Sequence, residues 1–162
     1  MLLLRVTGAL FLLPFAYFLR YSDKNAYECA LGGLLVLTVA LAQLFWQTPT
    51  RNSTLHRVDA AAAKMSLVCF IAYTLARKLP AELMASYCAV LAGVVTAAAL
   101  SQHYSCRDWG GARHIRAHAA LHALCAIGAF YAFLDTRAYT SHAWLSDAPA
   151  TSFSPAYPTG LQ

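Results

Sequence analysis

The chain alternates long apolar runs with short polar segments, and this pattern predicts its fold. A run of about 17–25 apolar residues is long enough to form a helix that crosses a bilayer. Proline and glycine fall near the ends of several runs, where helices begin and end. We therefore expect an all-α fold, a polytopic membrane helix bundle. Its five predicted transmembrane helices cover residues 1–19, 29–47, 60–76, 80–100 and 117–134.

The first apolar run shares some features with a signal peptide, which would be removed from the mature protein. Pro14 interrupts this run, however, and the run ends at Leu19-Arg20-Tyr21 without a small-residue cleavage site. We therefore interpret residues 1–19 as a retained first membrane span.

The composition changes after Asp135, where alanine, serine, threonine and proline become dominant. Residues 140–162 have no apolar period and contain three prolines, which is typical of disordered segments. The sequence thus predicts a transmembrane helical domain at residues 1–138 and a disordered tail at residues 139–162.

The overall composition supports a membrane protein. Hydrophobic residues make up 59% of the 162 residues and charged residues only 12%, whereas a soluble domain has about 25% charged residues. The chain has 12 Lys and Arg against 7 Asp and Glu, but the basic residues lie between the apolar runs and form no patch for nucleic acid. The five cysteines include no CxxC pair, so we interpret them as small packing residues.

The basic residues also predict an orientation. We interpret residues 48–59 and 101–116 as loops. If the spans alternate in direction, these loops and the N-terminus lie on one side of the membrane. Seven Lys and Arg lie near that side and five near the other. Because cytoplasmic loops carry the excess of basic residues, this small difference assigns the first side to the cytoplasm.

Three histidines recur at a spacing of four residues near the last predicted span: His114, His118 and His122. On a helix, positions i and i+4 lie on one face, so the three imidazole rings form one stripe. His118 and His122 fall inside the apolar run, where ionisable side chains are costly and usually functional. Arg113 and Arg116 flank His114, which predicts that this ring lies at the membrane interface. The alternative is that neutral imidazoles hydrogen-bond to a neighbouring helix.

His56 and Asp59 lie between the second and third predicted spans, on the same side as the three histidines. Three histidines can hold a zinc ion and leave a fourth position for water. The ion lowers the pKa of that water, and a nearby carboxylate can accept its proton. The sequence therefore supports a candidate zinc site at His56, His118 and His122, with Asp59 as the base.

The segment from His118 to His122, followed by ALCAIGAF, resembles the HxxxH segment in the last span of the CREST superfamily of membrane hydrolases. That superfamily includes the alkaline ceramidases and the progestin and adiponectin receptors. Its members have a Ser and a His at the end of the second span and an Asp at or near the third, which correspond here to Ser53, His56 and Asp59. The resemblance implies that the three histidines bind zinc and that Ser53 and Asp59 are catalytic. It also implies a lipid amide or ester as substrate, and hence a membrane lipid as partner.

The chain departs from that superfamily in several ways. Members usually have seven spans, their Ser precedes the His by four residues, and their Asp lies about ten residues beyond it. Here Ser53 is three residues before His56 and Asp59 is three residues after it. The resemblance covers roughly 30 of the 162 residues. Five spans also leave open whether a lipid pocket would need a partner subunit or a homo-oligomer.

Two other functions are compatible with the sequence. The first is a non-catalytic multi-pass membrane protein whose histidines are packing or interface groups. The second is haem or copper binding by histidine pairs, but bis-imidazole haem ligation needs histidines on two facing spans. Because His56 falls in a predicted loop, we rank haem below the other two functions.

Overall fold

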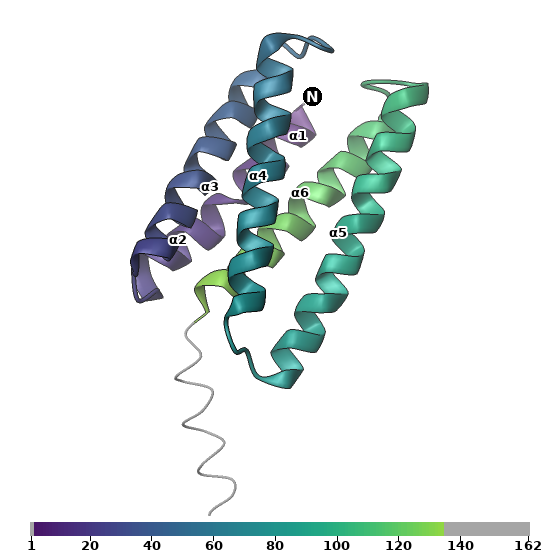
Figure 1. The fold of residues 1–162 in the computed structure, drawn as a ribbon. Coiled ribbons are helices and arrows are strands. Elements are labelled where there is room, and N and C mark those ends of the chain that lie inside the picture. The colour runs from purple at the N-terminus through teal and green to yellow at the C-terminus, as the bar shows by residue number, and fades with distance from the viewer. Residues whose placement is uncertain (1, 135–162) are drawn as a thin grey trace, which may run out of the picture.

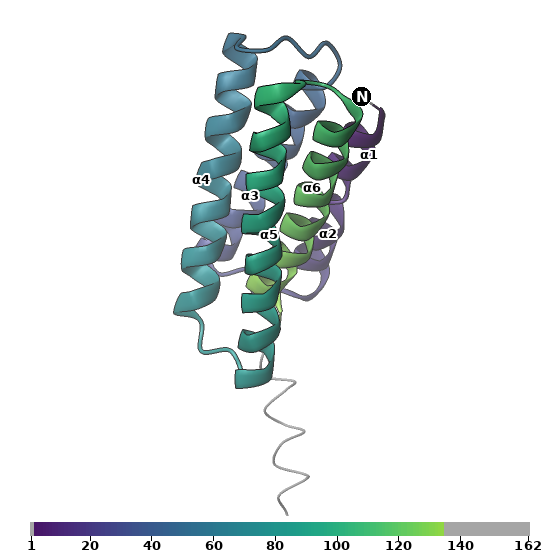
Figure 2. The same ribbon diagram turned by 90° about the vertical axis from the view of Figure 1, so that its right-hand side faces the viewer.

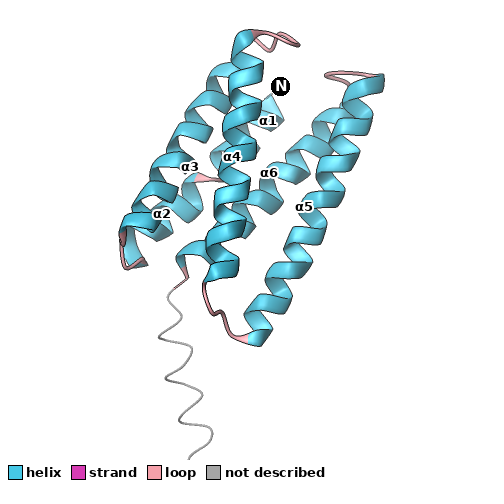
Figure 3. Ribbon diagram, viewed as in Figure 1, coloured by secondary structure: helices cyan, strands magenta, loops and turns pink. Residues whose placement is uncertain are grey.

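The structure, a computed structural model, describes residues 2–134, which form helices joined by short loops (Figures 1 and 3). The helices are α1 (Leu2–Ala9), α2 (Leu12–Tyr21), α3 (Ala26–Phe45), α4 (Thr54–Ala76), α5 (Ala81–Arg107) and α6 (Ala112–Phe133). With α1 and α2 counted as one span, five segments are long and apolar enough to cross a membrane. The predicted all-α bundle of five transmembrane helices is confirmed, and the protein is membrane-embedded. The predicted domain boundary at residue 138 and the predicted tail at 139–162 lie outside the described residues.

The first span is broken near its middle, just before Pro14. Proline has no backbone N–H, and in a regular helix its ring would clash with the carbonyl four residues earlier, which here belongs to Leu10. At the break, the N–H of Leu10 donates to the carbonyl of Thr7 at 3.2 Å, and the N–H of Leu13 donates to the carbonyl of Leu10 at 3.0 Å. These i to i+3 bonds form a tighter turn than an α-helix does, and they carry the chain from α1 into α2.

Several helices extend beyond the apolar runs. α4 already begins at Thr54, and α5 continues to Arg107 before α6 begins at Ala112. The predictions of loops at 48–59 and 101–116 are therefore wrong, because these segments contain helical turns of α4, α5 and α6. A helix can continue into polar residues past the bilayer, since its backbone hydrogen bonds do not depend on apolar side chains.

The last helix, α6, is flanked by four others. It packs against α1, α2, α4 and α5, while α3 packs against α4 and against both halves of the first span (Figures 1 and 2). One buried apolar cluster surrounds the last turns of α6 and includes Phe18, Leu35 and Phe133. A second surrounds its first turns and includes Leu4 and Phe45. The helix that carries the histidine stripe is thus held from several sides.

One glycine in α3 is required for the approach of α2. A Cβ atom at Gly32 would lie 2.8 Å from Cε1 of Phe18. The Phe18 ring packs in turn against the ring of Phe133, with the two ring centroids 5.0 Å apart. A Cβ atom at Gly33 would meet no atom within 4 Å. Of the glycine pair, only Gly32 makes room for a neighbouring helix.

A buried carboxylate, Glu28, joins three helices at the end of the bundle away from the histidines. Glu28 is 2% exposed. The Ser22 hydroxyl donates to its Oε2 at 2.6 Å, and the Tyr73 hydroxyl donates to its Oε1 at 2.9 Å. The Arg77 guanidinium lies 3.5 Å from the same Oε1 and also donates to two backbone carbonyls at the C-terminal end of α6. The carboxylate is therefore fully paired, and it ties α3 to the ends of α4 and α6.

Candidate functional site

The four histidines predicted to share one side of the membrane lie at one end of the bundle. His56 is in the first turn of α4, while His114, His118 and His122 follow one another along α6. Trp109 lies between the two helices, with its ring centroid 6.3 Å from that of His56 and 6.2 Å from that of His114. We call these four histidines and the side chains around them the histidine end.

The imidazole rings of α6 form the continuous row that their spacing predicts. The ring centroids of His114 and His118 are 5.7 Å apart, and those of His118 and His122 are 4.7 Å apart. His114 is 4% exposed, and the other two rings are partly buried. The row runs from the end of α6 towards the interior of the bundle, and successive rings meet different neighbours.

His118 is hydrogen-bonded to α5. Its Nδ1 lies 2.9 Å from Oγ of Ser101, which is buried. The ring also packs against the indole of Trp46, with centroids 5.5 Å apart. A serine hydroxyl can donate or accept, so this contact is compatible with either neutral tautomer of the ring. Within residues 2–134, Nε2 of His118 makes no hydrogen bond.

His122 is hydrogen-bonded to α1. Its Nδ1 lies 3.3 Å from Oγ1 of Thr7. The Thr7 hydroxyl also lies 2.9 Å from the carbonyl of Leu3, and because a hydroxyl can donate or accept, the contact with His122 suits either neutral tautomer of the ring. The edge of Phe11 closes the site, with its ring centroid 6.1 Å from that of His122. His122 therefore joins α6 to the first half of the broken span.

His56 is bound into the start of its own helix. Ser53 is the N-cap residue of α4, and its Oγ accepts from the backbone N–H of His56 at 3.1 Å. The ring stacks on Phe45, with centroids 4.9 Å apart and planes 7° apart. Nδ1 of His56 accepts from the backbone N–H of Asn52 at 3.0 Å. In the neutral ring the proton is therefore on Nε2.

His114 is held in the same way. Its Nδ1 accepts from the backbone N–H of Gly110 at 3.0 Å, so its proton is also on Nε2 in the neutral ring. Gly110 has a φ of 81°, a left-handed conformation that favours glycine, and this turn directs its N–H towards the ring. The ring is enclosed by protein, whereas Arg113 and Arg116 on either side of it are exposed.

The predicted zinc ligands differ in what they can offer a metal. A histidine ligand needs an unshared lone pair on a ring nitrogen. The lone pair of His56 faces the N–H of Asn52, so His56 offers none in this arrangement. Within the described part of the chain, no group of three or more His, Cys, Asp or Glu side chains is placed to hold a metal ion. Zinc at His56, His118 and His122 stays a prediction, and it requires the Asn52–His56 bond to break.

The two predicted catalytic residues lie near His56. Ser53 caps α4, so its hydroxyl oxygen already has a structural role. Asp59 lies one turn beyond His56 on α4 and is half-buried. No hydrogen bond or ion pair joins Asp59 to another residue in the range 2–134. Its carboxylate is therefore available, but no direct contact links it to the histidines of α6.

Sequence reasoning missed the residues that hold the histidines. Thr7 and Ser101 are isolated hydroxyl residues within or beside apolar segments. That position was the only sign in the sequence that they could bond to another helix. Which histidine each one meets depends on how the helices pack, which the spacing does not reveal. Trp46, which packs against His118, is 3% exposed, and its indole N–H has no partner within residues 2–134.

No family model, curated protein or solved structure matches this chain. The resemblance to the CREST superfamily is therefore carried only by the residues quoted for it.

Proposed function

We propose that this chain is a non-catalytic multi-pass membrane protein whose histidines hold its helices, and the turns before two of them, in place. One observation carries the proposal. Nδ1 of each of the four histidines at the histidine end has a hydrogen-bond partner within the chain. Two of these partners, Ser101 and Thr7, lie on other helices, and the remaining two are backbone N–H groups in the turns before α4 and α6.

The bilayer makes such bonds useful. Lipid tails are as apolar as leucine, so membrane helices associate through close packing and interhelix hydrogen bonds. Each such bond contributes about 0.6 kcal/mol on average and up to about 1.7 kcal/mol. A neutral imidazole supplies the bond without the cost of a buried charge. His118 and His122 thereby fix α6 against α5 and α1.

A double-mutant cycle between His118 and Ser101 tests this role. We expect Ser101→Ala and His118→Ala to show a coupling of about 0.6 kcal/mol or more in the free energy of unfolding in mixed micelles. The coupling should be unchanged by a metal chelator. A control cycle between Ser101→Ala and His103→Ala should show none, because His103 is exposed. Coupling that disappears on chelation would contradict the proposal.

A second candidate is a zinc-dependent hydrolase of a lipid amide or ester. His118 favours it, because Nδ1 is bonded to a hydroxyl while Nε2 has no partner, an arrangement common among metal-binding histidines. Asp59 also favours it as a half-buried carboxylate at the same end. The test is hydrolysis of a lipid amide by purified protein. Activity that is lost in Asp59→Asn, with zinc content unchanged, would support this candidate, and no activity in the wild type would remove it.

A further inference from the structure

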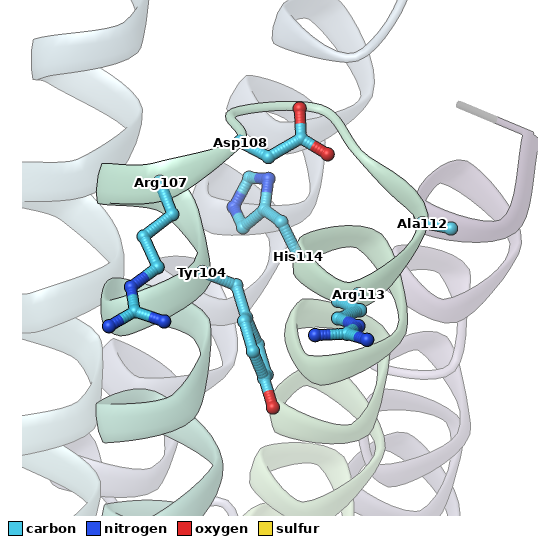
Figure 4. Close-up of a pocket in the computed structure, with 6 residues that line it drawn as sticks. All are labelled: Tyr104, Arg107, Asp108, Ala112, Arg113 and His114. Atoms are coloured by element: carbon cyan, nitrogen blue, oxygen red, sulfur yellow. The ribbon is translucent and has the colours of Figure 1, made fainter.

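A hollow of about 350 Å³ lies beside the turn between α5 and α6 (Figure 4). It is lined by Tyr104, Arg107, Asp108, Ala112, Arg113 and His114. None of the residues predicted to bind zinc or to act in hydrolysis lines it. Sites for small molecules have volumes of about 300–1,000 Å³, so the hollow suits a ligand of the size of a lipid headgroup.

Two arginines reach the hollow from different helices. Arg107 comes from the last turn of α5 and Arg113 from the first turn of α6, and both are exposed. Neither makes a salt bridge or a hydrogen bond within residues 2–134. In Figure 4 their guanidinium groups lie on either side of Tyr104. Two unpaired positive charges around one hollow favour an anionic ligand.

His114 adds a donor from the wall of the hollow. The residue is 4% exposed, and its Nδ1 accepts from Gly110, so its Nε2 carries a proton. No residue in the described part of the chain accepts a hydrogen bond from that Nε2–H. Among residues 2–134, the buried polar side-chain atoms without a partner are on Trp46 and Thr74, so Nε2 of His114 is open to solvent. The ring can therefore donate to a ligand that enters the hollow.

Asp108 is the one carboxylate of the lining, and within residues 2–134 no ion pair joins it to either arginine. Asp108 packs against the backbone of Gly111, where an added Cβ atom would lie 1.8 Å from Oδ2. Figure 4 shows this carboxylate pointing away from the guanidinium groups of Arg107 and Arg113. Two arginines and one aspartate leave the lining with a net charge of +1.

We propose that this hollow binds the phosphate of an anionic phospholipid headgroup. The fork of an arginine guanidinium matches the geometry of phosphate, and charge-assisted hydrogen bonds of this kind are strong. The lining begins at Tyr104, one helical turn past the predicted span that ends at residue 100, and the headgroup region of a bilayer borders the ends of its spans. α5 also exposes apolar side chains to lipid, including Leu100, so the acyl chains can lie along the same helix.

The experiment measures thermal unfolding of the full chain in detergent micelles with added lipid. Dioleoylphosphatidylglycerol should raise Tm by about 5 °C when it is in large excess over its Kd. Dioleoylphosphatidylcholine, which carries the same acyl chains and no net charge, should raise it much less. The double variant Arg107→Gln/Arg113→Gln should weaken the affinity for the anionic lipid by about tenfold or more. Because both arginines are exposed and unpaired, this variant should fold.

Arg116→Gln is the matched control. Arg116 is exposed on α6 and does not line the hollow. Its substitution removes a positive charge of the same kind as those of Arg107 and Arg113. This variant should keep the response to phosphatidylglycerol. An equal loss in Arg116→Gln, or an equal effect of the two lipids on wild-type protein, would overturn the proposal. Inorganic phosphate forms a third arm: if it reproduces the whole shift through Arg107 and Arg113, the ligand is free phosphate, and the assignment to lipid is wrong.

Discussion

The backbone N–H of Asn52 donates a hydrogen bond to Nδ1 of His56, and the two atoms are 3.0 Å apart. Asn52 has a φ of 62°, in the left-handed region that asparagine adopts more readily than most residues. The turn before α4 thus fixes both the position of the His56 ring and its neutral tautomer. In our proposal His56 consequently belongs to the helix start rather than to a metal site.

The first prediction concerns this turn. Asn52→Val should lower the free energy of unfolding by about 1–2 kcal/mol, because a β-branched residue is strained at positive φ. Asn52→Gly keeps the N–H and tolerates the same φ, so it should stay within about 0.5 kcal/mol of the wild type. Unfolding in mixed micelles measures both variants. Equal stability of the two would mean that the left-handed turn is not needed to start α4.

The glycine pair of α3 gives a second prediction. Gly32→Ala should cost about 1–3 kcal/mol, because its Cβ would overlap the packed ring of Phe18. Gly33→Ala, at the adjacent position with no atom within 4 Å, should be neutral or slightly stabilising, since alanine favours a helix. The same unfolding assay compares them. Equal effects would show that α2 and α3 are not packed as the structure has them.

The third prediction concerns Glu28 and Arg77. Glu28→Ala should cost roughly 3 kcal/mol, because it leaves the guanidinium without its carboxylate. Glu82→Ala is the control: Glu82 is exposed in the first turn of α5, where its loss should cost less than about 1 kcal/mol. If the two substitutions are equally mild, Glu28 does not tie the helices together.

The fourth prediction concerns the sides of the membrane. In a cysteine-free background, cysteines placed at Thr50 and Asp108 should react with an impermeant maleimide from the same side, and a cysteine at Lys78 from the other side. The excess of basic residues predicts that the Thr50 and Asp108 side is cytoplasmic. Labelling in intact and permeabilised cells tests both points. Opposite labelling of Thr50 and Asp108 would contradict the five-span topology.

The sequence predicts the fold more fully than the site. Apolar runs are sufficient to count the spans, since length and composition decide whether a helix can cross a bilayer. The break before Pro14 and the cap at Ser53 follow from local chemistry. The C-terminal end of α5 and the start of α6 do not follow from the sequence, because hydropathy marks where lipid ends rather than where the helical hydrogen bonds end.

The partners of the histidines show where sequence reasoning stops. The stripe of His114, His118 and His122 follows from a spacing of four residues. The contact of His118 with Ser101 depends instead on the rotation of α5 and α6 about their own axes. That rotation is set by many packing contacts between helices, and no local pattern records it.

The central claim is that His118 and His122 join helices, that His56 and His114 fix the turns before α4 and α6, and that none of them forms a metal centre. It is tested most directly by the zinc content per chain of full-length protein, purified in detergent and dialysed against micromolar zinc. Wild type, His118→Ala and His114→Ala should all lack stoichiometric zinc. About one zinc per chain in the wild type and in His114→Ala, but none in His118→Ala, would contradict the claim and support the predicted site at His56, His118 and His122.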